Sequence, residues 1–496
     1  MLTTTKRLLM RCIATLCVAT VFLVRAEDVD APIATQLAKL VANDGAANDQ
    51  LGQSIAISDG IAVVGAPYKD SKSGVVYLFQ MSSSDDANSW TQVAKLTADD
   101  RSAGDLFGES VAIGDGTIVV GAKADHKGSD SGAVYLFQMS SSGDASSWTQ
   151  VAKLTADDGA KGDAFGKSVA ISDGTIVVGA FGDDDKDLNS GAAYLFVKSS
   201  PDDASSWTQV AKLTADDGAK LDYFGRSVAI SDGTIVVGAP DDDDKGYASG
   251  AAYLFQMSSP DDASSWTEVA KLTADDGGRA DRFGQSVAIS DGTIFVGAHG
   301  DDDKGSDSGA VYLFQMSSSG DASSWTQVAK LTADDGAKHD RFGISFGISD
   351  GTIVVGAHGD DDKGSDSGAA YLFVKSSPDD ASSWSQVAKL TADDGAESDY
   401  FGTSVAISDG TIVVGAYYDD DKGSNSGSAY LFQMKTESPP PALPSPPPSE
   451  IVPDEKTITL FAGCSPLDKL TFNVENFQQQ VGAMLITKSL SNDFKY

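Results

Sequence analysis

Aspartate is concentrated in two kinds of segment that return along the chain, and closely spaced carboxylates can bind a metal ion. One kind follows a Gly-Ala pair, where Asp301, Asp303 and Asp307 stand at alternate positions around Gly305. Alternating oxygens around a glycine turn suit calcium, partly as in an EF-hand loop. The candidate metal ligands are Asp183, Asp185, Asp242, Asp244, Asp301, Asp303, Asp307, Asp360, Asp362, Asp366, Asp419 and Asp421.

A purely solvating role for these loops is the alternative. The pattern lacks the bidentate glutamate of an EF-hand, and Ala248 takes the place that Asp307 holds in its copy. Acidic loops also keep a strand-rich protein soluble and discourage its association. Adjacent carboxylates repel one another, which favours a counter-ion near them. Calcium is therefore a candidate cofactor, and the solvating role stays open.

The second acidic segment ends in an aspartate two residues before a recurrent Phe-Gly pair. This aspartate is present in all seven copies, as Asp49, Asp105, Asp163, Asp222, Asp281, Asp340 and Asp399. Because every copy carries it, a structural role suits it better than a unique ligand site. We expect its carboxylate to accept hydrogen bonds from backbone amides in the turn.

The sequence contains no recognisable catalytic constellation. It has no nucleophile elbow, phosphate loop or zinc-ligand spacing. The four histidines, His126, His299, His339 and His358, lie in loops and are better explained as variants between copies than as metal ligands. Lys161-Gly162-Asp163 resembles an integrin-recognition tripeptide, but other copies have different residues there. We therefore expect no enzyme activity, with an enzyme on the same scaffold as the alternative.

The acidic loops belong to a sequence repeat of 56 to 59 residues. The phrase Phe-Gly-x-Ser-Val-Ala-Ile-Ser-Asp-Gly-Thr-Ile-Val-Val-Gly-Ala returns seven times, opening at Leu51, Phe107, Phe165, Phe224, Phe283, Phe342 and Phe401. Each copy contains four strand-like runs, in which apolar residues alternate with small or polar ones. In the fourth copy these runs cover residues 226–230, 234–239, 251–257 and 267–272. Four antiparallel strands repeated at this length predict a propeller blade.

The ends of the repeat predict an all-β ring of seven four-stranded blades over residues 33–434. The seventh copy supplies three strands, over residues 403–407, 411–416 and 428–434, before a proline-rich stretch begins. Residues 35–40 match the missing fourth strand. We expect this N-terminal strand to complete blade seven, because a closed ring removes the edges that an open stack exposes. An open solenoid is the alternative.

Aromatic residues of the repeat are expected in the core rather than in a ligand cage. A tryptophan opens six of the fourth strands, as Trp90, Trp148, Trp207, Trp266, Trp325 and Trp384. Phe224 and its equivalents are expected between neighbouring blades, and their glycine partners suit close backbone approach.

Both acidic segments should lie on one face of the disc. In an antiparallel four-stranded blade, the connection from strand two to strand three and that from strand four to the next blade leave from the same end. These connections hold more than half of the 72 acidic residues. We therefore predict an acidic loop face, and expect binding to occur there.

The repeat resembles the FG-GAP family, which is named for its Phe-Gly and Gly-Ala-Pro elements. Gly65-Ala66-Pro67 and Gly238-Ala239-Pro240 carry the full second element, whereas Gly179-Ala180-Phe181 and Gly297-Ala298-His299 replace proline. The family includes the seven-bladed propeller heads of integrin alpha subunits and many secreted and surface proteins of microbes and algae. The resemblance implies extracellular recognition or adhesion, but it names no ligand.

The chain departs from integrin propellers at their calcium loops. Those loops lie in the hairpin between strands one and two and hold several Asp or Asn residues at alternate positions. Here the hairpin reads Ile230-Ser231-Asp232-Gly233-Thr234. One aspartate cannot supply the roughly six to eight oxygens that calcium prefers, so the family's calcium sites are not expected at this position.

Composition limits the classes of partner. The 496 residues carry a net charge of −36, which argues against nucleic acid or an anionic membrane as the main partner, because both need basic patches. The hydrophobic content of 41% argues against disorder. No segment after the N-terminal one is apolar enough to span a bilayer. An extracellular protein or glycan is the expected partner.

Residues 1–26 are predicted to be a secretory signal peptide. A basic segment precedes an apolar run over residues 12–24, and Val24-Arg25-Ala26 is an acceptable cleavage site. An uncleaved anchor is the alternative, although the run is short for a membrane span. The predicted location is secreted or at the extracellular cell surface. Cleavage would leave Cys464 as the one cysteine, either free or paired with another chain.

The C-terminal part divides into two predicted segments. Residues 435–450 are rich in proline and serine and predict an extended linker, or stalk. Residues 451–496 form a short segment of uncertain fold, with strand-like runs over residues 457–461 and 470–474.

The sequence as a whole predicts a non-enzymatic extracellular propeller for recognition or adhesion. It would bind a protein or glycan through its acidic loop face, with calcium as the candidate cofactor. The alternative is a structural component of the cell surface or matrix, in which near-identical blades act as a spacer without a specific small ligand.

Overall fold

The computed structural model describes residues 34–82, 89–125, 130–140, 146–200, 203–259, 262–317, 324–377, 380, 382–434, 456–461 and 466–472. The chain divides into two units, Met1–Thr436 and Glu437–Tyr496. The predicted signal peptide, the linker over residues 435–450 and Cys464 lie outside the described residues. No helix in the described part of the chain is long and apolar enough to cross a membrane.

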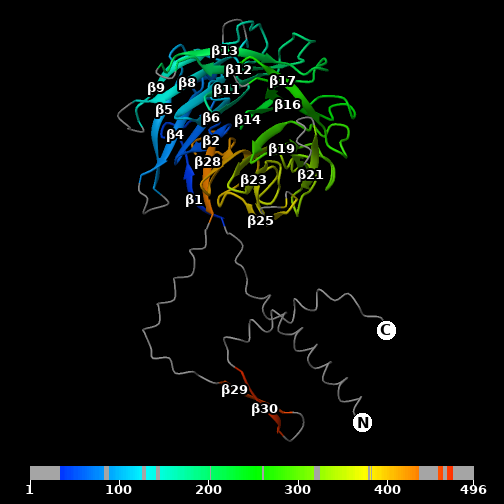
Figure 1. Cartoon of the computed structure of the whole chain (residues 1–496). Helices are drawn as coiled ribbons and strands as arrows, with labels where there is room; N and C mark the ends of the chain where they lie inside the picture. The colour runs from blue at the N-terminus through cyan, green and yellow to red at the C-terminus, as the bar shows by residue number, and fades with distance from the viewer. Residues whose placement is uncertain are drawn as a thin grey trace. The chain divides into compact units, whose positions relative to one another are not determined.

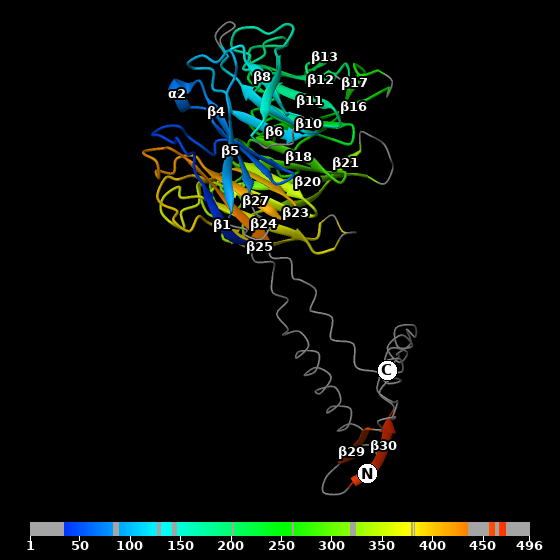
Figure 2. The ribbon, with the colours of Figure 1, turned by 90° about the vertical axis from the view of Figure 1, so that its left-hand side faces the viewer.

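The first unit is a ring of seven four-stranded antiparallel sheets (Figures 1 and 2). The first strands of the blades are β2 (Ile55–Ser58), β6 (Ser110–Gly114), β10 (Ser168–Ser172), β14 (Ser227–Ser231), β18 (Ser286–Ser290), β22 (Ser345–Ser349) and β26 (Phe401–Ser408). The second strands are β3 (Ile61–Ala66), β7 (Thr117–Ala122), β11 (Thr175–Ala180), β15 (Thr234–Ala239), β19 (Thr293–Ala298), β23 (Thr352–Ala357) and β27 (Thr411–Ala416).

The outer half of each blade completes the sheet. The third strands are β4 (Val75–Met81), β8 (Ala133–Met139), β12 (Ala192–Lys198), β16 (Ala251–Met257), β20 (Ala310–Met316), β24 (Ala369–Lys375) and β28 (Ser428–Met434). The fourth strands are β5 (Trp90–Leu96), β9 (Trp148–Leu154), β13 (Trp207–Leu213), β17 (Trp266–Leu272), β21 (Trp325–Leu331), β25 (Trp384–Leu390) and, for blade seven, β1 (Ala34–Leu40). A four-residue helix, α2 (Lys69–Lys72), lies between β3 and β4. The predicted all-β propeller is confirmed.

The hairpin between the first two strands shows how local sequence sets the register. Asp232 and Gly233 both have positive φ angles, of 48° and 69°, which a tight turn of the I′ type requires. The turn pairs Ser231 with Thr234 and Ile230 with Ile235. Asp and Gly tolerate the left-handed conformation better than other residues, so this dipeptide closes the hairpin without an inserted loop.

The ring closes through the N-terminal strand, as predicted. β1 pairs antiparallel with β28, which places Lys39 opposite Tyr430. The pair is visible where the blue start of the propeller lies beside its orange end (Figure 1). The closure covers the strand edge that blade seven would otherwise expose.

Among the described residues of the propeller, the core consists of seven apolar clusters, and each joins two neighbouring blades. Phe283, for example, is fully buried and packs edge-on against Tyr312 and Phe314. Trp266 is partly buried against the same kind of cluster. The prediction that the repeated Phe residues lie between blades is confirmed.

A ring of serine hydrogen bonds also links the blades. The serine two residues after each Phe-Gly pair donates to the carbonyl oxygen of the next Phe-Gly glycine; Ser286 Oγ, for instance, lies 2.8 Å from Gly343 O. The last link, from Ser404 Oγ to Gly52 O at 2.7 Å, joins blade seven to blade one. The full set of donors is Ser54, Ser110, Ser168, Ser227, Ser286, Ser345 and Ser404.

The second unit contains one described hairpin. β29 (Lys456–Phe461) pairs antiparallel with β30 (Pro466–Phe472). The first strand agrees with the predicted run over residues 457–461, whereas the second begins four residues before the predicted start at Leu470.

Candidate functional site

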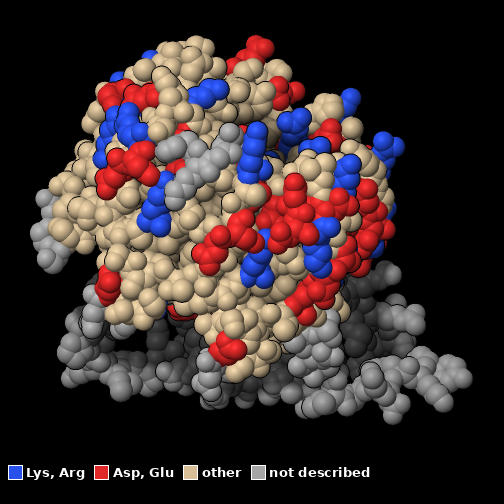
Figure 3. Space-filling view, turned by 90° about the horizontal axis from the view of Figure 1, so that it is seen from above, with Lys and Arg blue, Asp and Glu red and all other residues tan. Residues whose placement is uncertain are grey.

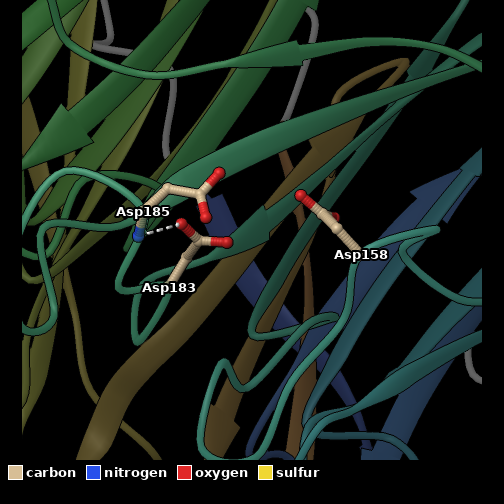
Figure 4. Close-up of side chains that lie close together, drawn as sticks. All are labelled: Asp158, Asp183 and Asp185. Carbon is tan, nitrogen blue, oxygen red and sulfur yellow. Dashed lines mark hydrogen bonds between the residues drawn. The ribbon is translucent and has the colours of Figure 1, made fainter.

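Carboxylates from the two acidic connections meet in blades three to seven. In blade three, Asp158 lies in the connection before β10, and Asp183 and Asp185 lie between β11 and β12 (Figure 4). One carboxylate oxygen of each lies within 4.8 Å of the other two. The same triads are Asp217, Asp242 and Asp244; Asp276, Asp301 and Asp303; Asp335, Asp360 and Asp362; and Asp394, Asp419 and Asp421. The two acidic connections therefore share one face, as predicted.

A lysine ammonium lies among the three carboxylates of each triad. In blade four, Lys271 Nζ is 2.7 Å from Asp217 Oδ2, 2.9 Å from Asp242 Oδ2 and 2.5 Å from Asp244 Oδ2. The corresponding lysines of the other triads are Lys212, Lys330, Lys389 and Lys39. The ammonium group occupies the position that a metal ion shared by these oxygens would take.

The strand register brings the lysine to the triad. Lys271 on β17 is the cross-strand partner of Tyr253 on β16, and its Nζ lies 5.1 Å from the centroid of the tyrosine ring. The Tyr253 hydroxyl lies 2.9 Å from both Asp242 Oδ2 and Asp217 Oδ1, which share its single donor hydrogen. A register shift between Leu254 and Phe255 sets this part of the pairing.

Burial differs sharply within a triad. The side chain of Asp242 is 5% exposed, whereas those of Asp217 and Asp244 are 49% and 57% exposed. A buried carboxylate is stable only when it is paired and hydrogen-bonded, which Lys271 and Tyr253 achieve for Asp242. The two outer carboxylates still present oxygens to solvent.

The pKa shifts agree with an ammonium-centred cluster. Burial alone would raise the pKa of Asp217, but hydrogen bonds from Lys271 and Tyr253 outweigh it and lower that pKa. Burial alone would lower the pKa of Lys271, but the three aspartates outweigh it and raise that pKa. Burial and the same carboxylates raise the pKa of Tyr253. The cluster thus holds a charged lysine and a neutral tyrosine at neutral pH.

The triads contain every predicted metal ligand except Asp307 and Asp366. The backbone amide of Asp307 donates to Asp302 Oδ1 at 2.8 Å, and its Oδ2 lies 3.1 Å from His339 Nδ1. The amide of Asp366 donates to Asp361 Oδ1 at 2.8 Å. Both residues have positive φ angles, so the alternating aspartates end in a turn and do not all converge on one point.

Sequence reasoning missed one carboxylate of each triad and the lysine. The omitted aspartates are Asp158, Asp217, Asp276, Asp335 and Asp394. A signal was present, because every fourth-strand run carries lysine at the same place, as in Ala270-Lys271-Leu272. The pattern does not reveal that this lysine faces the acidic loops, since a register shift in the pairing of the third and fourth strands sets its position.

Blades one and two carry altered versions of the cluster. In blade two, Lys153 pairs with Asp100 at 2.7 Å and with Asp125 at 2.8 Å. In blade one, Lys69 replaces the first aspartate, and its buried Nζ lies 2.7 Å from Asp49 Oδ2. Lysine therefore reaches this cluster from the connection between the second and third strands as well as from the fourth strand.

The aspartate before each Phe-Gly pair has the predicted structural role. Asp281 Oδ2 accepts a hydrogen bond of 2.6 Å from the backbone amide of Gly278, and the same bond recurs in all seven copies. Burial raises the pKa to about 6 at four of these residues, Asp222, Asp281, Asp340 and Asp399.

The repeated triads could hold a metal ion if the lysine side chain moved aside. Three carboxylates and a tyrosine hydroxyl would then surround the cation, and the exposed outer carboxylates leave room for water. These groups are oxygen donors of the kind that calcium prefers. Figure 3 shows acidic side chains gathered densely on one side of the view, with Lys and Arg side chains between them.

Comparison with known families agrees with this architecture. The FG-GAP repeat family matches seven segments that together cover most of the chain, over residues 34–79, 90–137, 148–196, 207–255, 266–314, 325–373 and 384–432. A search of curated proteins gave no match. With seven matched repeats that coincide with seven four-stranded blades, the chain belongs to the FG-GAP repeat family.

Proposed function

We propose that this chain is a non-enzymatic protein for extracellular recognition or adhesion. It binds a protein or glycan of the cell exterior through the acidic loop face. The observation that carries the proposal is the convergence of two acidic connections on one face in blade after blade. FG-GAP propellers are generally binding or structural domains, and the outer carboxylates remain accessible to a ligand.

Within this proposal the lysine is the resident cation of each triad, and calcium competes with it. Asp185, Asp244 and Asp303 have side chains 61%, 57% and 52% exposed. Calcium reaches these oxygens from solvent and joins them to acidic groups of a ligand. Because the ammonium already occupies the centre of each triad and offsets one of its three charges, calcium binds weakly to the protein alone and more tightly when a ligand supplies further oxygens.

A binding screen with matched variants tests this function. The full-length chain is applied to arrays of extracellular proteins and glycans in millimolar calcium and again with a chelator. We expect a ligand whose binding falls in the variant Asp185→Asn/Asp244→Asn/Asp303→Asn. The control is Asp173→Asn/Asp232→Asn/Asp291→Asn, which removes the same charge from the hairpins between first and second strands. Equal binding by both variants would overturn the acidic face as the binding surface.

A structural role is the second candidate, and the near-identity of the blades favours it. The seven apolar clusters and the closed ring of serine bonds make a rigid disc that needs no ligand to hold its shape. A spacer of this kind would bind nothing on the arrays and would self-associate instead. Sedimentation of the full-length chain at increasing concentration distinguishes the two candidates.

A further inference from the structure

Three of the positions at which the seven repeats differ lie together in the structure. They are the residue before Phe-Gly, the residue after it, and the residue after Gly-Ala, and they are termed the variable positions. These positions flank the first two strands at the end where the acidic connections leave. Neighbouring first strands contact one another around the ring. The variable residues therefore form an inner rim, while the triads lie at the third and fourth strands.

Two cavities open at this rim, with volumes of about 220 and 280 Å³. Arg282 contributes to both of them. Phe181, Tyr223 and Arg226 line the first, and His299 and Arg341 are among the residues that line the second, so the site spans blades three to six. All of these residues occupy the variable positions of their repeats.

The rim is rich in arginine, although the chain is strongly acidic. Three of the five arginines in residues 27–496 line these two cavities. Arg226 makes no ion pair with any described residue and lies 5.6 Å from the centroid of the Phe181 ring. Arg282 is half exposed, and its Nε lies 3.7 Å from Asp241 Oδ1, which is too long for a hydrogen bond. These guanidinium groups retain unused donors.

His299 and His358 lie beside these arginines. Each has a buried Nδ1 atom with no hydrogen-bond partner in the described part of the chain. Arg341 Nη1 lies 3.2 Å from His358 Nε2, and an arginine can only donate, so the proton of His358 is on Nδ1. Burial and the neighbouring Arg282 lower the pKa of His299 to about 3, which keeps its imidazole neutral. Buried polar atoms without partners suggest that a bound group completes the site.

We propose that this rim binds an acidic saccharide, with a carboxylate or sulfate group of the sugar held by Arg226, Arg282 and Arg341. Guanidinium forks match the geometry of such groups and form strong charge-assisted hydrogen bonds. Phe181 and Tyr223 offer aromatic faces for the apolar face of the sugar ring. A sugar acid fixes its charge to a rigid ring, so it matches arginines that are held beside aromatic side chains. A flexible acidic peptide matches them less well.

The acidic connections around the rim contribute to selectivity. They repel polyanions at short range. Only a ligand whose acid groups reach the arginines is therefore attracted by the arginines more strongly than it is repelled by the aspartates. The proposal rests on the recognition role of the propeller but uses none of the triads, so the two sites can fail separately.

Calorimetric titration of the full-length chain tests the site. The probes are a galacturonic acid tetramer for carboxylates, a heparin tetrasaccharide for sulfates, a neutral glucose tetramer and tetraglutamate. We expect binding of at least one acidic sugar and of neither other probe. Arg282→Gln and Arg341→Gln should each weaken binding at least about tenfold. Arg282→Lys should also weaken it, because lysine keeps the charge but loses the fork.

Arg101→Gln is the matched control, because Arg101 is exposed, pairs with Asp70 and lies outside both cavities. It should bind the acidic sugar as the unaltered chain does. The proposal would be overturned if neither acidic sugar bound the chain. It would also be overturned if Arg282→Gln and Arg341→Gln each bound the sugar as tightly as the unaltered chain does. Tetraglutamate binding as tightly as the sugar would replace the saccharide by an acidic peptide. Binding lost in Asp185→Asn/Asp244→Asn/Asp303→Asn but kept in the arginine variants would refute this site alone.

Discussion

At the scale of single residues, the lysine of the fourth strand offsets part of the negative charge of the acidic face. Lys271 brings one positive charge to three carboxylates and makes a short contact with each. A calcium ion at the same point would bring two charges, but it would have to displace the ammonium and recruit further oxygens. The internal cation is covalently attached and pays no entropy of association. The lysine ammonium therefore occupies the triad in preference to calcium wherever the calcium concentration is low.

Without this lysine, the carboxylates of the triad should repel one another and destabilise the fold. We expect Lys271→Met to lower the free energy of unfolding by about 1–3 kcal/mol, because Asp242 would remain buried without its cation. Millimolar calcium should restore part of that loss, since it can then occupy the vacated position. Urea unfolding with calcium and with a chelator measures both effects.

Lys220→Met is the control for this prediction, because Lys220 is exposed and lies outside the triads. It should change the free energy of unfolding by less than about 0.5 kcal/mol. Loss of stability in Lys220→Met equal to that in Lys271→Met would mean that general charge, and not the triad, is responsible.

The aspartate before Phe-Gly predicts an effect of pH on stability. The pKa of Asp281 is raised to about 6 in the folded chain, above its ordinary value of about 3.9 when unfolded. The folded state therefore binds more protons between these values, and the contribution of Asp281 to stability is full below about pH 4 and is lost as pH rises through about 6. Asp281→Asn should stabilise the chain at pH 7.5 by about 1 kcal/mol and give no gain at pH 4.

Chemical denaturation across this pH range checks the prediction, with Asp291→Asn as the control at an exposed hairpin. Asp291→Asn should change stability equally at both pH values. A constant difference between Asp281→Asn and the unaltered chain from pH 4 to 7.5 would show that the carboxylate of Asp281 has an ordinary pKa.

At the scale of the elements, the Phe-Gly and Gly-Ala phrases are junctions between blades. Gly250, just before β16, forms a parallel bridge with Phe283 of the next blade, and the Phe283 amide donates to Ser249 O at 3.1 Å. A Cβ on Gly250 would lie 2.0 Å from Phe283 O, and its φ angle is 84°. The glycine is thus required by both conformation and space.

Substitution of Gly250 should reduce stability by more than the change in backbone conformation alone would. Gly250→Ala combines a left-handed φ angle with a clash against backbone, so we expect a loss of about 2–4 kcal/mol. The matched control is Gly233→Ala, which has a φ angle of 69° but no atom within 4 Å of the added Cβ. It should cost about 1 kcal/mol. Equal losses in thermal unfolding would contradict the junction role of Gly250.

Most elements could be predicted from sequence, because the repeat displays each strand seven times. The hairpin Asp232-Gly233, the alternating runs and the N-terminal strand Ala34–Leu40 each carry a local signal that the structure confirms. The triads could be predicted only in part. Asp242 and Asp244 are close in sequence, but Asp217 and Lys271 reach them through blade geometry and a register shift, which no short-range pattern encodes.

At the scale of the whole molecule, the propeller separates charge into concentric zones of one face. The outer zone holds the triads with their lysines, and the inner rim holds arginine, histidine and aromatic side chains. The composition gives only the total net charge of −36 and not its distribution over the surface. In blades three to seven, a lysine lies among the three aspartates of each triad and offsets part of that charge.

Thermal unfolding of the full-length chain in calcium and in chelator tests this charge arrangement most directly. Because the strand-four lysines already occupy the centres of the triads, we expect Tm to differ by less than about 2 °C between 2 mM calcium and excess chelator, a change on the order of 1 kcal/mol or less. A rise of about 10 °C or more in calcium would show that metal displaces the lysines and that the triads are metal centres in the native protein.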